Sequence, residues 1–114
     1  MNEKTIDRII QESVPGKQIT IAHVIAAPMP EIYERLGIDG KGALGILTLT
    51  PCETAIIAAD VATKAAEVEI GFLDRFTGSV ILSGDVQSVE TALLAVTDTL
   101  QRLLNFDTVA VTKT

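Results

Sequence analysis

The order of secondary-structure patterns between residues 43 and 104 constrains the fold more than any other feature of the sequence. In order, they predict strand, helix, strand, strand and helix over residues 43–50, 51–67, 68–74, 79–83 and 85–104. This β-α-β-β-α order is most of a split βαβ unit, which needs one more strand. Residues 18–26 are the only candidate, and they precede the rest. The sequence therefore predicts an α+β fold in which a familiar arrangement is rotated along the chain.

The two longer helices have distinct sequence signals. Thr50-Pro51-Cys52-Glu53 fits a capping box with proline at the first helical position. Asp85 is expected to cap the longest helix. A small-residue stripe on the first helix would let another backbone approach closely, at Ala55, Ala59, Ala62 and Ala66. The stripe on the second helix has core-facing spacing, at Val89, Leu93, Val96, Leu100 and Leu103.

Residues 18–26 alternate as a strand. One face is expected to carry Ile19, Ile21, His23 and Ile25, and the other Thr20, Ala22 and Val24. Both faces are fairly apolar, which favours a strand inside a sheet. Pro28 and Pro30 end the strand, and Pro30 is suited to begin a short helix that stops at Gly37. Residues 106–114 alternate weakly and favour a short final strand.

The N-terminal segment is ambiguous. Ile6, Ile9 and Ile10 have helical spacing, whereas Ile10, Glu12 and Val14 alternate like a strand. Residues 14–17, which read VPGK, then predict a turn.

The chain is more apolar than its size would suggest. Its 114 residues allow one domain, which buries roughly 60–70% of the surface of the unfolded chain. Yet 47% of the residues are hydrophobic, and the mean hydropathy is +0.38. That is too apolar for disorder. The longest uncharged run, residues 18–30, is also too short to cross a membrane. We therefore expect the domain to bury part of its surface against copies of itself.

Charge and reactive residues exclude several functions. The formal charge is −6 and Lys and Arg are scattered, so nucleic-acid binding is not expected. One cysteine, Cys52, excludes an intramolecular disulfide and a cysteine-based zinc site. With one histidine, His23, we find no nucleophile–base or acid–base pair, and we expect no enzyme activity, metal or cofactor. The start of the chain has no apolar signal segment, which favours the cytoplasm.

Two further motifs have structural interpretations. Residues 40–45 fit G-x-G-x-x-G, but a predicted helix precedes them and a strand follows, the reverse of a dinucleotide-binding turn. The glycines of the motif are interpreted as loop residues. His23, which has no Cys or carboxylate at ligand spacing, is interpreted as a hydrogen-bonded structural residue.

Several separated runs resemble a known family. Residues 58–68 read AADVATKAAEV, similar to the first helix of bacterial microcompartment (BMC-domain) shell proteins. Residues 22–28 read AHVIAAP, similar to the last strand of that family, here moved to the front. This order, with residues 14–18, 48–51 and 70–76, resembles the circularly permuted subgroup, the ethanolamine-utilisation S and propanediol-utilisation U types. The resemblance extends from about Ile9 to Thr114.

The resemblance implies a ferredoxin-like BMC domain over residues 17–114, preceded by an extension over residues 1–16. It implies a flat homohexamer that tiles with other shell proteins into a metabolosome shell serving ethanolamine, propanediol or choline utilisation. Six N-terminal segments would form a β-barrel over the central pore, which would make the ambiguous segment a strand. The implied barrel residues are Ile9, Ile10, Gln11, Glu12, Ser13 and Val14. An encapsulated enzyme or its targeting peptide is a further implied partner.

The resemblance also implies roles for single residues. The loop around the pore would be formed by Asp74, Arg75, Phe76 and Thr77. Lys64 would lie at the hexamer edge, although its spacing from Asp60 alone indicates an ordinary solvated i,i+4 pair. Asp74 and Arg75 alone likewise indicate a polar hairpin tip. One departure is Ala27, where the standard family has an arginine.

A second class of function remains open from the residues alone. Ferredoxin-like folds host many small-molecule-binding regulatory domains, which would show ligand-dependent stability or assembly. The sequence contains no cluster of polar residues that predicts such a pocket.

Overall fold

The computed structural model describes residues 16–39 and 42–114. Its elements are β1 Gln18–Ile25, α1 Pro30–Leu36, β2 Ala43–Thr50, α2 Thr54–Ala65, β3 Glu69–Asp74, β4 Ser79–Gly84, α3 Val86–Leu104 and β5 Thr112–Lys113. The predicted α+β class and element order are confirmed. The described helices include none that is both long enough and apolar enough to cross a membrane.

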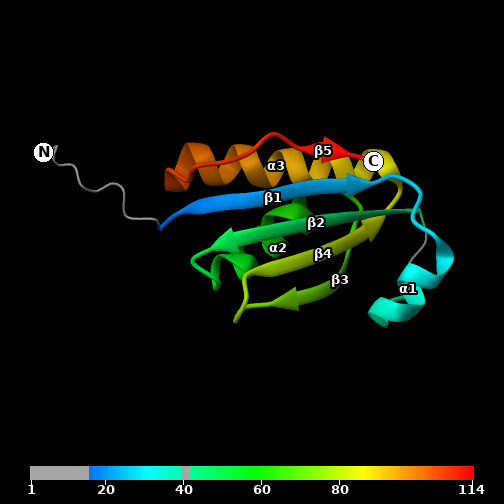
Figure 1. The fold of residues 1–114 in the computed structure, drawn as a ribbon. Helices are drawn as coiled ribbons and strands as arrows, with labels where there is room; N and C mark the ends of the chain where they lie inside the picture. The colour runs from blue at the N-terminus through cyan, green and yellow to red at the C-terminus, as the bar shows by residue number, and fades with distance from the viewer. Residues whose placement is uncertain (1–15, 40–41) are drawn as a thin grey trace, which may run out of the picture.

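The strands form one sheet in the order β3-β4-β2-β1-β5. β1 is antiparallel to β2 and parallel to the short β5, so it lies inside the sheet as predicted. The long helices α2 and α3 lie together on one face, while α1 stands apart where β1 ends and β2 begins (Figure 1). The leading strand thus completes the β-α-β-β-α unit.

The core lies between the sheet and the helices α2 and α3. Four alanines of α2 are buried, at Ala55, Ala58, Ala59 and Ala62. Helix α3 comes so close to β2 that a Cβ on Gly45 would lie 2.7 Å from Cγ1 of Val89. The α3 stripe is fully buried from Val89 to Leu100. The prediction for Leu103 is wrong, because its side chain is 67% exposed. The chain turns after α3 and brings Phe106 into the core in its place.

The predicted capping box is also wrong. Thr50 pairs with Gln18 as the last residue of β2, so it is extended and does not cap a helix. Residues 51–53 form a turn, and α2 begins only at Thr54, without a side-chain cap. Cys52 therefore precedes the helix and does not occupy its first turn. By contrast, Asp85 caps α3 as predicted, with its carboxylate accepting a 2.9 Å hydrogen bond from the Ser88 backbone N–H.

A β-bulge changes the predicted faces of β1. The register with β2 shifts between Ile19 and Ile21, which removes strict alternation there. Ile19 consequently joins Ala22 and Val24 in the core, whereas Ile21 is exposed on the opposite face. The prediction that Ile19 and Ile21 share a face is therefore wrong.

Candidate assembly site

The β3–β4 hairpin contains the four predicted pore-loop residues. One Asp74 carboxylate oxygen accepts hydrogen bonds from the backbone N–H of Phe76 at 2.8 Å and of Thr77 at 3.4 Å. The other accepts the Thr77 hydroxyl at 2.9 Å. These donors, the Phe76 N–H first, hold the pKa of Asp74 below its ordinary value. The carboxylate therefore fixes the shape of the loop.

The end of the hairpin is anchored to the sheet. Gly78 has a φ of 80°, and its carbonyl accepts a 2.8 Å hydrogen bond from the Leu49 N–H. A Cβ at Gly78 would lie 2.2 Å from the Leu49 carbonyl oxygen, so this position requires glycine. At the tip, Phe76 is exposed and the Arg75 guanidinium lies 4.9 Å from its ring centroid. The tip therefore presents a cation and an aromatic ring to solvent from a fixed base.

Lys64 belongs to α2 and lies near the end of β3 that is opposite the hairpin loop. Its Nζ is 2.9 Å from Oδ2 of Asp60, which confirms the i,i+4 pair, and both side chains are exposed. Lys64 is near the end of α2, which leads into the start of β3, whereas the hairpin loop follows the end of β3. Six extended residues span about 20 Å, so the structure separates the loop from the lysine and does not combine them in one site.

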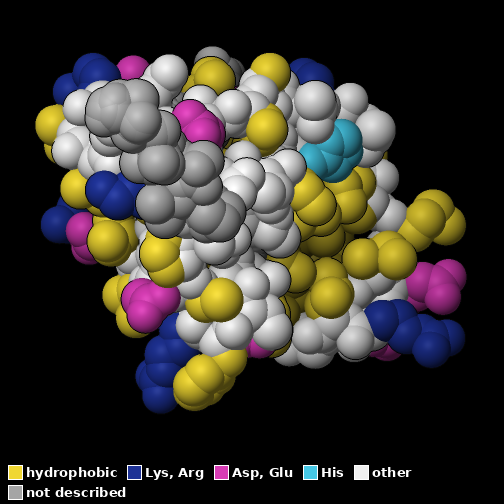
Figure 2. Space-filling view, turned by 60° about the vertical axis from the view of Figure 1, so that its left-hand side comes forward, with side chains coloured by type: hydrophobic (Ala, Val, Ile, Leu, Met, Phe, Trp, Pro, Cys, Tyr) yellow, Lys and Arg dark blue, Asp and Glu magenta, His cyan; other side chains and the backbone are white. Residues whose placement is uncertain are grey.

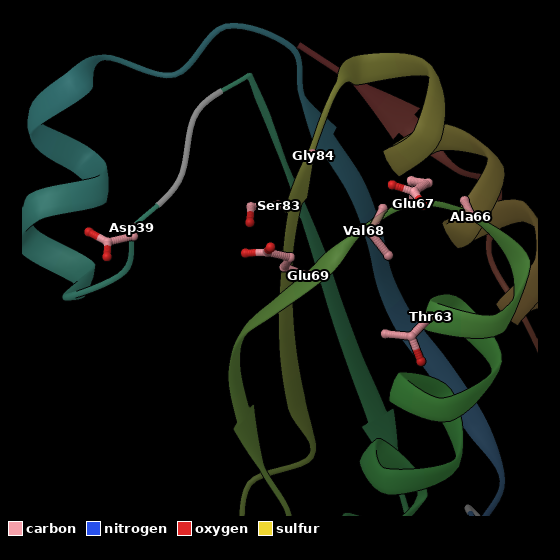
Figure 3. A pocket seen from close by; sticks show the side chains of 8 residues that line it. All are labelled: Asp39, Thr63, Ala66, Glu67, Val68, Glu69, Ser83 and Gly84. Atoms are coloured by element: carbon pink, nitrogen blue, oxygen red, sulfur yellow. The ribbon is translucent and has the colours of Figure 1, made fainter.

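A pocket of about 480 Å³ lies beside the end of α2 (Figure 3). Its wall carries three carboxylates and two hydroxyls, from Asp39, Glu67, Glu69, Thr63 and Ser83. Among residues 16–39 and 42–114, no group of three His, Cys, Asp or Glu side chains is placed to hold a metal ion. The described residues that line the pocket therefore supply no metal centre.

His23 connects β1 to the C-terminal segment. Its Nδ1 lies 2.6 Å from the Thr112 hydroxyl and its Nε2 lies 2.9 Å from the Thr114 hydroxyl. The structural interpretation of His23 is confirmed. The motif over residues 40–45 follows α1, and its second half, residues 43–45, is the start of β2, so the loop interpretation is wrong for Gly45. Residues 40–41 lie outside the described part. The predicted barrel residues, 9–14, also lie outside it.

Comparison with known proteins identifies the fold. The family model described as BMC domain matches residues 43–112. The chain belongs to the BMC-domain family. The match begins at β2, and β1 precedes it in sequence although it lies between β2 and β5 in the sheet. This is the permuted order predicted from the sequence.

The similarity of the BMC chain to known relatives extends over nearly its whole length. It is 64% identical over 108 residues to bacterial microcompartment shell protein CutR of Streptococcus intermedius, covering 95% of the chain and 93% of the relative. It is 56% identical over 113 residues to shell protein PduU of Salmonella typhimurium, covering 98% and 97%. The resemblance to permuted BMC shell proteins is therefore confirmed.

A solved structure is equally similar to the BMC chain. The CutR flat hexamer, form 1, is 62% identical, has a TM-score of 0.85 and covers 95% of this chain and 100% of its own. None of these similarities assigns a role to Lys64 or to the hairpin loop. Those roles stay predictions. Ile46, Ile81 and Phe72 lie paired on the sheet face away from the helices, and no local sequence pattern singles them out.

Proposed function

We propose that this chain is a structural shell protein of a bacterial microcompartment. It forms a flat cyclic homohexamer that tiles with other shell proteins into the shell of a cytoplasmic compartment. The observation that carries the proposal is the similarity to the CutR flat hexamer over 95% of the chain. The reported relatives are shell proteins, which favours this role over a regulatory domain and over an enzyme.

Two groups of residues at opposite ends of β3 support the assignment of a pore and of an outer edge in such a ring. Residues 74–77 lie at one end of β3, and Lys64 lies near the other. We propose that the loop surrounds the central pore and that the lysine lies at the hexamer edge. Arg75 and Phe76 would then each occur six times around the axis. This arrangement matches what the family resemblance implies for these residues.

The position of β1 supports a barrel over the pore. Gln18, at the start of β1, pairs with Thr50 at the end of β2. The backbone N–H of Leu49, next to Thr50, donates a hydrogen bond to the Gly78 carbonyl at the end of the hairpin loop. The chain before β1 therefore enters at the same end of the sheet as the proposed pore loop. We propose that residues 1–16 of six chains form the β-barrel that caps the pore, and that it is available to an encapsulated enzyme or its targeting peptide.

Solution mass combined with electron microscopy tests the proposal. Six chains of 12.1 kDa have a mass of about 73 kDa, and we expect particles of that mass with sixfold symmetry. A matched sample that lacks residues 1–16 is expected to keep the ring and to change access to the pore. A stable monomer of the full chain would overturn the shell proposal. An unchanged pore after truncation would overturn only the barrel.

A further inference from the structure

The pocket beside the end of α2 contains a buried hydroxyl group. Its volume of about 480 Å³ lies in the range of small-molecule sites, roughly 300–1,000 Å³. Ser83 lines the pocket from β4, and this residue is only 6% exposed. Within residues 16–39 and 42–114, no group forms a hydrogen bond with the Ser83 side chain. Buried hydroxyls usually have a partner, so a ligand that donates to this oxygen would satisfy it.

The carboxylate of Glu69 accompanies this hydroxyl. Glu69 on β3 and Ser83 on β4 are directly paired, so their side chains project from the same face of the sheet. Figure 3 shows both side chains on the side of β3 that faces Asp39. No lysine or arginine of the described residues forms an ion pair with Glu69. A carboxylate and a hydroxyl that can both accept favour a positively charged hydrogen-bond donor.

The described wall of the pocket is negatively charged. It carries the carboxylates of Asp39, Glu67 and Glu69, and none of its eight described residues is a lysine, an arginine or a histidine. The nearby Lys64 is paired with Asp60 at 2.9 Å. The wall would repel an anion, and its carboxylates are not grouped closely enough to hold a metal ion. The charge therefore favours an organic cation.

We propose that this pocket binds a primary alkylammonium group. Such a group has three N–H donors, of which the Glu69 carboxylate and the Ser83 hydroxyl each accept one. Ala66 and Val68 are partly buried in the wall and offer apolar contact to the alkyl chain. A free amine and a lysine side chain of another protein chain both carry this group. The site belongs to the single chain and lies at the end of β3 opposite the hairpin loop, so it does not depend on the pore.

Saturation-transfer NMR of the assembled full chain, with n-butylammonium as the probe, tests the proposal. We expect a saturable signal that n-butanol, which has the same alkyl chain without the charge, does not reproduce. An uncharged alkyl group would instead favour the apolar hollow beside the histidine, which Figure 2 shows on another part of the surface. Equal saturable binding of the two probes would overturn the proposal.

Two variants remove one acceptor each. Ser83→Ala and Glu69→Gln are each expected to raise the Kd for n-butylammonium about tenfold, as the loss of a hydrogen bond to a charged group does. The matched control is Glu53→Gln, which removes the same charge from an exposed residue at the other end of α2 and should leave the Kd unchanged. An unchanged Kd in both pocket variants, or an equal loss in Glu53→Gln, would overturn the proposal.

Electron microscopy of extended sheets separates the two sources of the ammonium group. If a lysine of an adjoining shell protein supplies it, Ser83→Ala weakens sheet formation. If a free amine supplies it, the sheets stay unchanged. Both results retain the ammonium site. A parent chain that is monomeric would overturn the shell proposal alone, because the probe titration requires only the folded chain.

Discussion

The two faces of the same sheet differ in what covers them. On the helix side, Leu47 and Val80 are fully buried beneath α2 and α3, in a core that the chain completes alone. On the opposite face, turned away from α2 and α3 and called the open sheet face here, Ile46 and Ile81 alternate with those residues along the same two strands, yet they remain partly exposed. The sheet is therefore apolar on both sides, although the single chain provides helices for only one. The comparison separates residues that stabilise the chain from residues that stabilise the assembly.

The largest expected effect comes from the covered face. Leu93→Ala removes a fully buried side chain beneath the sheet, and we expect the free energy of unfolding to fall by about 2–5 kcal/mol. Urea unfolding of dissociated chains measures this. A loss below about 1 kcal/mol would mean that α3 does not cover the sheet as described.

A smaller effect on the chain is expected at the open face. Phe72→Ala should change the free energy of unfolding of dissociated chains by less than about 1 kcal/mol, because the side chain is half-exposed before assembly. The hexamer should nevertheless dissociate at a higher protein concentration than the parent does. Sedimentation across a dilution series measures this change. If monomer stability fell as much as in Leu93→Ala, the two faces would not differ as proposed.

At the proposed hexamer edge, Lys64→Ala removes an exposed ion pair worth about 0.3–0.5 kcal/mol to the chain. The ring is expected to stay intact, while formation of extended sheets or tubes should weaken. Electron microscopy of assembled samples is the measurement. Arg102→Ala is the control, because it removes an equivalent exposed i,i+4 pair with Asp98 on α3. Dissociation of the Lys64→Ala hexamer into monomers would contradict the edge assignment.

The smallest effect is the pH dependence of the hairpin loop. The Phe76 N–H and the Thr77 hydroxyl lower the pKa of Asp74 from its ordinary value of 3.8. A carboxyl group whose pKa is lower in the folded state stabilises it above the ordinary pKa and loses that contribution as the pH falls through the lowered pKa. The difference in unfolding free energy between the parent and Asp74→Asn should therefore be largest near pH 7 and shrink below pH 4. A difference that grows on acidification would contradict this account.

Local signals predicted the covered face well. The α3 stripe from Val89 to Leu100 and the Asp85 cap depend on spacing within one helix, so the sequence was sufficient for both, whereas Leu103 fails because the chain turns after α3. Errors arose where pairing between strands decides the outcome. Thr50 looked like a helix cap but pairs with Gln18, and Ile19 changes face through a bulge that only the β1–β2 register defines.

The open sheet face and the site residues were harder to predict, for a related reason. The row through Phe72, Ile81 and Ile46 exists only once the strand order and register are known. The hairpin loop was predicted as a turn, but the hydrogen bonds that fix it through Asp74 were not. The assembly roles of the loop and of Lys64 came from the family resemblance, because their local spacing predicts only an ordinary polar turn and a solvated ion pair.

Electron cryo-microscopy of the assembled full chain tests the central claim most directly. We predict a sixfold ring with the β3–β4 loop toward the axis and Lys64 toward the outer edge. A map in which the β3–β4 loop lies away from the axis would contradict the proposed pore role of residues 74–77. An assembly without sixfold symmetry would contradict the proposed shell tile.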